Sequence, residues 1–130
     1  MIDGADTGPS LDRIDEWERG FAERAAQAKT LAERTAQLSA TARGSDGLIE
    51  VTVGPNGQIT DLRLDEEIRR QPAATTARQI LSTLRAAQRA LLRQVEGVAA
   101  ETVGADSATA KAVLSSLSAR LSADDEEPMP

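Results

Sequence analysis

The chain has no cysteine and no histidine, and this double absence removes several kinds of chemistry. Without cysteine there is no disulfide and no thiol nucleophile, and without histidine the commonest general base is missing. A structural zinc site would lack its usual ligands. Only carboxylates and the two lysines, Lys29 and Lys111, are left for catalysis. The acidic residues have no catalytic or calcium-binding spacing, so we expect no enzyme activity, no catalytic residue, no metal and no cofactor.

Aromatic residues are almost as scarce, with one tryptophan, one phenylalanine and no tyrosine among 130 residues. Recognition of single-stranded nucleic acid by base stacking needs exposed aromatic side chains, so this mode is poorly supported. A core built mainly from Ala, Leu, Ile and Val buries little area per side chain. A single domain of this kind is marginally stable alone, which favours a homodimer.

Long hydrophobic runs are also missing, since no stretch approaches the roughly 20 apolar residues of a membrane span. The first ten residues are acidic and lack the basic and apolar regions of a signal peptide. We therefore expect a cytoplasmic protein that has no membrane contact. Because no catalytic group of residues can be named, we also expect no small-molecule substrate.

Positive charge is confined largely to the middle of the chain. Residues 1–62 carry 11 acidic and 6 basic side chains, residues 63–95 carry 3 and 7, and residues 96–130 carry 7 and 2. These segments have net charges of −5, +4 and −5, which sum to the formal net charge of −6. Coating of nucleic acid by bulk charge is therefore disfavoured, but a local basic face remains available.

Residues 11–37 favour a long helix, because they are rich in Ala, Glu, Arg and Gln and contain no proline. Ser10 is placed to cap this helix. A narrow apolar stripe with a spacing of three and four residues runs along it. Its large members include Ile14, Trp17, Phe21 and Leu31. Such a stripe is typical of a helix that packs on another helix, either in a second subunit or within the same one.

Beyond residue 44 the apolar period changes to two, which predicts a β-hairpin. Its first strand places Ile49, Val51 and Val53 on one face. Residues 54–57, Gly-Pro-Asn-Gly, have the composition of a turn. The second strand, residues 58–64, also alternates. One face is predicted to carry Thr60, Leu62 and Leu64, and the other Ile59, Asp61 and Arg63.

A short helical turn is expected at residues 65–71, followed by a second long helix from Pro72 to about residue 100. At 100° per residue, its apolar side chains fall on one face and its arginines on the opposite face. The apolar residues are Ile80, Leu84, Ala87, Leu91, Val95 and Val98. The arginines are Arg78, Arg85, Arg89 and Arg93.

The arginine face of this second helix is the candidate binding site. Guanidinium groups spaced by 7, 4 and 4 residues recur along one face, and each can hold a phosphate through two hydrogen bonds. Arg69 and Arg70 form a second, smaller basic site. A solvent-facing helix surface also needs charge of some kind, so an ordinary solvated face is the alternative.

Gly104 interrupts the helical pattern, and Asp106 or Ser107 can cap a third helix. Its apolar side is expected to fold back on the domain or to dock on a partner. That side consists of Ala110, Val113, Leu114, Leu117 and Leu121. The expected organisation is a flexible N-terminus at 1–9, an α-β-β-β-α domain at 10–103, an additional amphipathic helix at 104–122 and a disordered acidic tail at 123–130.

The order helix, strand, turn, strand and long helix resembles the YbaB/EbfC family of bacterial nucleoid-associated proteins. The resemblance covers about residues 11–96 and is strongest at 47–65, where GLIEVTV, a glycine-containing turn and ITDLRLD follow one another. It implies an α+β fold with a long N-terminal helix, a three-stranded antiparallel β-meander and a long C-terminal helix, here with an extra short helix. It also implies that residues 38–43, which by propensity look like the end of the first helix, form the first strand.

The resemblance further implies a YbaB-like homodimer that binds duplex DNA at the nucleoid. Because the chain is acidic and phosphate contacts carry no base information, we expect this binding to be weak and to have little sequence specificity. The expected DNA-binding residues are Arg78, Arg85, Arg89, Arg93, Arg69 and Arg70. The expected dimer-interface residues are Ile14, Trp17, Phe21, Leu31, Val51 and Val53. The acidic charge and the added C-terminal segment are similar to those of acidic actinobacterial members linked to type VII secretion loci. The alternative is a dimeric adaptor or chaperone-like protein that binds a protein partner, such as a secretion component, with little or no DNA binding.

Overall fold

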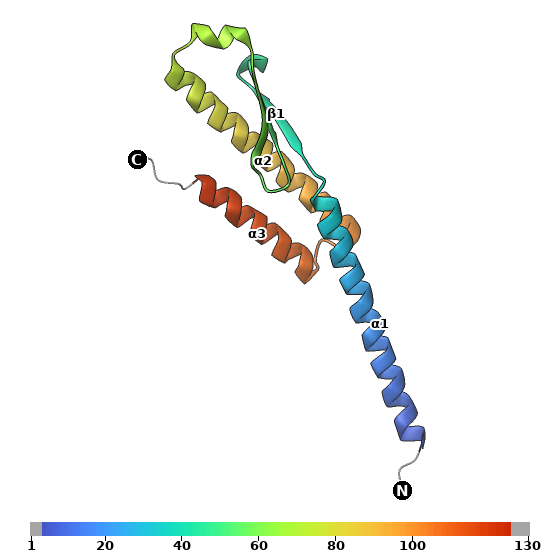
Figure 1. Ribbon diagram of the computed structural model, residues 1–130. Helices are drawn as coiled ribbons and strands as arrows, with labels where there is room; N and C mark the ends of the chain where they lie inside the picture. Colours follow the sequence, from blue (N-terminus) through green and yellow to red (C-terminus); the bar gives the residue numbers. More distant parts are fainter. Residues whose placement is uncertain (1–3, 126–130) are drawn as a thin grey trace.

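The computed structural model describes residues 4–125, which form three α-helices and a three-stranded antiparallel sheet (Figure 1). The helices are α1 (Gly4–Thr35), α2 (Ala73–Thr102) and α3 (Ala108–Asp125). The strands are β1 (Ala40–Gly44), β2 (Ile49–Val53) and β3 (Ile59–Leu64), and they lie in the order β1-β2-β3. Two short 3-10 turns, η1 (Ser45–Gly47) and η2 (Glu66–Arg70), complete the chain path. The predicted α+β class, the meander and the long helices are confirmed.

Helix α1 projects from the body of the molecule, as Figure 1 shows for its N-terminal half. The helix begins at Gly4, so the cap predicted at Ser10 is wrong and Ser10 lies inside the helix. Residues 12–27 contain no buried side chain. Near the C-terminal end of α1, Leu31 is buried against Val98 and Ala99 of α2 and Ala110 of α3. Among residues 12–35, the helix is therefore anchored only at its C-terminal end. Residues 1–3 of the predicted N-terminal segment lie outside the described part of the chain.

Strand β1 occupies the segment for which helix propensity and family resemblance disagreed, and the resemblance is confirmed. It pairs with β2 from Ala40 opposite Val53 to Gly44 opposite Ile49. Helix α2 lies very close to this strand. A Cβ atom added at Gly44 would collide with Oγ1 of Thr83, which belongs to α2. The close approach places α2 directly on β1.

The core lies between α2 and the first two strands. The predicted apolar face of β2 is confirmed, since Ile49, Val51 and Val53 are fully buried against residues such as Ala87 and Leu91 of α2. The opposite face of the sheet is polar and carries cross-strand contacts. These are Thr41 Oγ1 to Thr52 Oγ1 at 2.8 Å and Arg43 Nε to Glu50 Oε1 at 3.2 Å.

The predicted faces of β3 are wrong at its start, because a β-bulge intervenes. Thr52 pairs with Asp61 and Val53 pairs with Ile59, which leaves Thr60 without an opposite residue. Directly opposed residues share a face of an antiparallel sheet. Ile59 therefore lies on the core face opposite Val53 instead of sharing the polar face with Asp61.

The core face of β3 is left uncovered, although it continues the face of β2 that α2 buries. Leu62 lies opposite Val51 and Leu64 opposite Ile49, yet every residue of β3 is exposed. We call this uncovered apolar area the β3 surface. It consists of Ile59, Leu62 and Leu64, which are 41–44% exposed.

Helix α3 folds back beside α2, as its apolar side predicts (Figure 1). Ser107 is the cap, since its Oγ accepts a hydrogen bond from the Ala110 amide at 3.0 Å. The buried residues of the apolar side are Ala110, Leu117 and Leu121, while Val113 and Leu114 are partly buried. The helix continues to Asp125, and residues 126–130 of the predicted disordered tail lie outside the described part of the chain.

The contact between α3 and the β2–β3 turn predicts that Gly57→Ala destabilises the protein by about 2–3 kcal/mol. Gly57 has φ of +80°, and an added Cβ would collide with the side chain of Leu121. Its carbonyl also accepts a hydrogen bond from the buried Gln88 Nε2 at 3.0 Å. Urea unfolding of the variant measures the loss.

The matched control is Gly97→Ala in α2, where an added Cβ meets nothing within 4 Å. The same substitution in an open helical position should raise stability by up to about 1 kcal/mol. Equal unfolding midpoints for Gly57→Ala and the unmodified protein would show that Leu121 does not pack on this turn.

Candidate nucleic-acid interface

The solvent face of α2 carries the four arginines that the sequence singled out. Arg78, Arg85, Arg89 and Arg93 are all exposed, and Ala87, Leu91 and Val95 on the opposite side are buried. The predicted separation of the two faces is confirmed. With a rise of 1.5 Å per residue, the arginine positions extend over about 22 Å of the helix axis.

Packing and hydrogen bonds hold this helix in place relative to the sheet. Pro72 stands immediately before the first turn with φ of −60°. Gln71 Nε2 donates hydrogen bonds to Thr76 Oγ1 at 2.9 Å and to Gln79 Oε1 at 2.5 Å, which ties the preceding segment to the first turns. The apolar face then packs along β1 and β2. The arginine face consequently points away from the sheet.

Three of the four arginines on this face differ from most arginines elsewhere in the body of the molecule, because they lack a carboxylate partner among the described side chains. Four arginines elsewhere pair with carboxylates, in the pairs Arg34–Glu101, Arg43–Glu50, Arg63–Asp61 and Arg69–Glu66. In contrast, Arg78, Arg89 and Arg93 have no carboxylate within 4.0 Å among the side chains that the structure describes. Their positive charge is thus available to an external anion.

The smaller basic site lies in η2, just before α2 begins and therefore at the Arg78 end of the row. Asp65 caps this turn by accepting a hydrogen bond from the Glu67 amide at 2.9 Å. Both Arg69 and Arg70 are exposed. Arg69 lies 3.3 Å from Glu66, but both side chains are at least 80% exposed, so this pair contributes little to stability.

A comparison with protein families agrees with this geometry. A model of the YbaB/EbfC DNA-binding family matches residues 17–106, which include the whole sheet and α2. The chain belongs to the YbaB/EbfC DNA-binding family. This is a DNA-binding family and not a family of enzymes. No curated protein and no solved structure matches the chain.

Helix α3 lies beyond the part that the YbaB/EbfC model matches, since the match ends at residue 106 and α3 begins at Ala108. The helix nevertheless supplies Leu117 and Leu121 to the same core as β2 and α2. In this YbaB/EbfC chain the added segment is therefore part of the folded body.

The six predicted interface residues fall into two groups in this YbaB/EbfC chain. Leu31, Val51 and Val53 are 0–1% exposed, so their apolar area is used within the chain's own core. The other three, Ile14, Trp17 and Phe21, lie on the projecting part of α1. We call them the α1 surface. The rings of Trp17 and Phe21 stack with centroids 5.7 Å apart.

Sequence reasoning missed the β3 surface. Alternation in residues 58–64 showed that one face is apolar, but nothing local indicated that this face lacks a covering helix. Within residues 4–125, no group of three or more acidic side chains is placed to hold a metal ion. No helix in that range is long and apolar enough to cross a membrane.

Proposed function

We propose that the chain is a dimeric, nucleoid-associated protein of the cytoplasm that binds duplex DNA through its phosphates. The observation that supports this function is the row of exposed arginines on α2. Three of them, Arg78, Arg89 and Arg93, have no carboxylate partner among the described side chains. A guanidinium group offers two parallel N–H donors to a phosphate, which suits a surface that meets the DNA backbone.

Low sequence specificity follows from the kind of contact. Phosphate contacts position a protein on the duplex but carry no base information. The row is about 22 Å long, which corresponds to roughly two-thirds of a turn of B-form DNA. The formal net charge of −6 opposes the approach of another polyanion, so binding is expected to be weak.

The dimer is proposed to form through the β3 surface. Its three apolar residues lie directly beside the core, and the outer edge of β3 has no strand partner among residues 4–125. Leu81 of α2 lies two helical turns before Gln88, on the side of α2 that contacts the β2–β3 turn, and it is proposed to join this interface. Leu81 is itself 47% exposed. A second copy placed here covers this area and brings two arginine rows into one particle, which raises DNA avidity.

A second candidate function, an adaptor or chaperone-like role toward a protein partner such as a secretion component, is favoured by the α1 surface. Trp17 and Phe21 are 65% and 59% exposed on a projecting helix. Exposed aromatic side chains are common anchors of protein–protein interfaces. If this role is the principal one, DNA binding is weak or absent.

A gel-shift titration at low and at physiological salt, with two unrelated duplexes of equal length, tests the proposed function. We expect both duplexes to shift equally at low salt, because the contacts are to phosphates. We expect the affinity to fall steeply as salt rises, because binding releases counterions. The absence of a shift at low salt would exclude DNA as the ligand and favour the adaptor role. A strong preference for one duplex would contradict recognition by phosphate contacts alone.

A further inference from the structure

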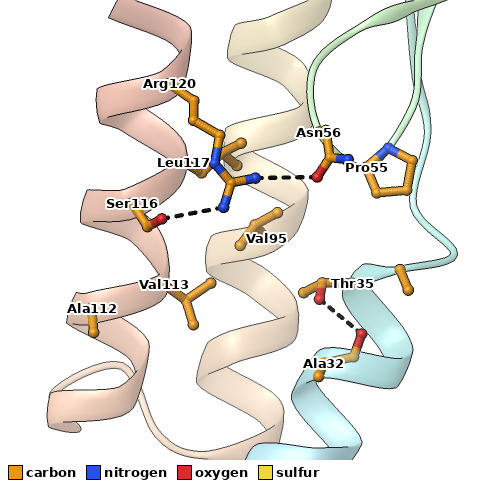
Figure 2. Close-up of a pocket in the computed structure, with 11 residues that line it drawn as sticks. Ala32, Thr35, Pro55, Asn56, Val95, Ala112, Val113, Ser116, Leu117 and Arg120 are labelled. Atoms are coloured by element: carbon orange, nitrogen blue, oxygen red, sulfur yellow. Dashed lines mark hydrogen bonds between the residues drawn. The ribbon is translucent and has the colours of Figure 1, made fainter.

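A cavity of about 500 Å³ lies where α1, α2, α3 and the β2–β3 turn meet (Figure 2). Pockets of roughly 300–1,000 Å³ are the usual size for small-molecule sites. The wall on the α3 side belongs to the segment beyond residue 106, so the family match does not account for this cavity.

The inner wall of the cavity is apolar. It is formed by Val95 of α2 and by Val113 and Leu117 of α3, with the small side chains of Ala32 of α1 and of Ala36, which directly follows α1, on the other side. Figure 2 shows Val95 and Val113 pointing into the space between the helices. Water in such a space finds few hydrogen-bond partners, so an aliphatic or aromatic group is the favoured occupant of this part.

The polar groups at one side of the cavity are positively charged or hydrogen-bond donors. Arg120 reaches from α3 toward the turn, where its Nη1 donates to Asn56 Oδ1 at 3.1 Å (Figure 2). Its Nη2 donates to Ser116 Oγ at 3.3 Å. Both acceptors are neutral, and no carboxylate among the described side chains lies within 4.0 Å of Arg120.

After these two hydrogen bonds, Arg120, Asn56 and Ser116 still have N–H or O–H donors that can bind a ligand. A guanidinium group carries five N–H donors, so Arg120 retains donors beyond its two hydrogen bonds. Because Asn56 Oδ1 accepts from Arg120, the Asn56 amide nitrogen remains as a donor. Ser116 Oγ accepts from Arg120, and its hydroxyl hydrogen can therefore be donated elsewhere. An anion with acceptor oxygens complements this edge.

We propose that the cavity binds a small amphipathic carboxylate. Arg120 and the Asn56 amide hold the carboxylate, and the hydrocarbon part lies against Val95, Val113 and Leu117. A bare inorganic anion would leave the apolar wall unoccupied, and a neutral hydrocarbon would leave the guanidinium without a counter-charge. Arg120 belongs to α3 and not to the arginine face of α2, so this site does not depend on the proposed DNA binding.

Titration of the full-length protein with octanoate, and with 1-octanol as the neutral analogue, tests the site by calorimetry and by methyl NMR spectroscopy. We expect one octanoate per chain, bound at least tenfold more tightly than 1-octanol, because the charged group gains the guanidinium contact. The methyl signals that shift should be those of Val95, Val113 and Leu117.

Two matched variants separate a specific site from general attraction. Arg120→Gln should lower the affinity for octanoate about tenfold, to the level of 1-octanol. Lys111→Gln removes the same charge from an exposed position on the same helix that does not line the cavity, and it should leave the affinity unchanged.

A third variant tests the cavity itself. Ala112→Trp fills the cavity from an exposed lining position and should abolish binding of both compounds.

Several results would overturn the proposal. These are no binding of octanoate, equal affinity for octanoate and 1-octanol, methyl shifts confined to other parts of the protein, or an unchanged affinity in Arg120→Gln. If Ala112→Trp fails to fold by circular dichroism, the comparison of Arg120→Gln with Lys111→Gln decides the matter by itself.

Discussion

Simultaneous replacement of Arg78, Arg85, Arg89 and Arg93 by glutamine is expected to abolish the DNA gel shift without unfolding the protein. Glutamine keeps much of the side-chain length but removes the charge that displaces counterions from DNA. Four lost phosphate contacts should lower the magnitude of the salt slope by about four units. Because a hydrogen bond to a charged group contributes about 1.5 kcal/mol or more, the affinity at low salt should fall more than about a thousandfold.

The control for bulk charge is replacement of four exposed basic residues of α1 by glutamine. These residues are Arg13, Arg19, Arg24 and Lys29. Each quadruple variant loses four positive charges, so both change the formal net charge from −6 to −10. The α1 variant should retain most of the shift. Equal loss in the two variants would assign binding to overall charge, and an unchanged shift in the α2 variant would show that its arginines are an ordinary solvated face.

Both quadruple variants should remain folded, since all eight side chains are exposed and none belongs to the core. Helical circular dichroism and the thermal midpoint check this. In the α2 variant the buried side of the same helix, which includes Ala87 and Leu91, is unchanged. A lost gel shift with a normal thermal midpoint therefore reports on the arginines and not on the fold.

Replacement of both Leu62 and Leu64 by glutamine is expected to convert a homodimer into monomers. In one chain the two leucines are 41% and 44% exposed, so their replacement costs a monomer little. In the proposed dimer, polar amides would be buried in place of apolar side chains in both subunits. The effect of four altered side chains should weaken association by more than about a thousandfold. Light scattering should change from twice 13.8 kDa to near 13.8 kDa at micromolar concentration.

The control for this variant lies on the other face of the same strand. Asp61→Asn combined with Arg63→Gln removes an exposed ion pair and leaves the net charge unchanged, so the dimer should persist. A mass near 13.8 kDa for the unmodified protein would contradict the dimer itself.

The α1 surface gives the competing location for the interface. Replacement of Trp17 and Phe21 by alanine should weaken the dimer by several kcal/mol if these rings are buried between subunits. If the variant with both leucines replaced remains dimeric while the alanine variant becomes monomeric, the interface lies on α1 and not on β3.

Sequence periodicity was sufficient to assign the faces of β2 and α2. The buried face of β2 and the opposed apolar and arginine faces of α2 follow directly from repeats of two and about 3.6 residues. These assignments were correct because they depend only on the geometry of one helix or strand. The composition of the Gly54 to Gly57 turn was likewise sufficient to place the hairpin.

The pairing register between strands could not be predicted from local sequence patterns. Ile59 lies on the core face because a bulge at Thr60 shifts β3 against β2, and this register depends on both strands at once. Strand β1 is a second case, since its Ala- and Thr-rich sequence has only a weak alternation. The resemblance to a family located this strand, and its pairing with β2 together with α2 packed on Gly44 explains why it forms.

The extent of covering elements was decided only by the tertiary structure. Leu31 and Trp17 belong to one continuous stripe in the sequence, yet one is 1% and the other 65% exposed. The stripe specifies which side of α1 is apolar, but the neighbouring ends of α2 and α3 cover only its C-terminal part. The cavity beside Arg120 arises in the same way, because it joins Arg120 to Asn56, which lies 64 residues earlier. Burial and binding sites of this kind depend on where separate elements begin, end and meet, which the repeat within any one element does not encode.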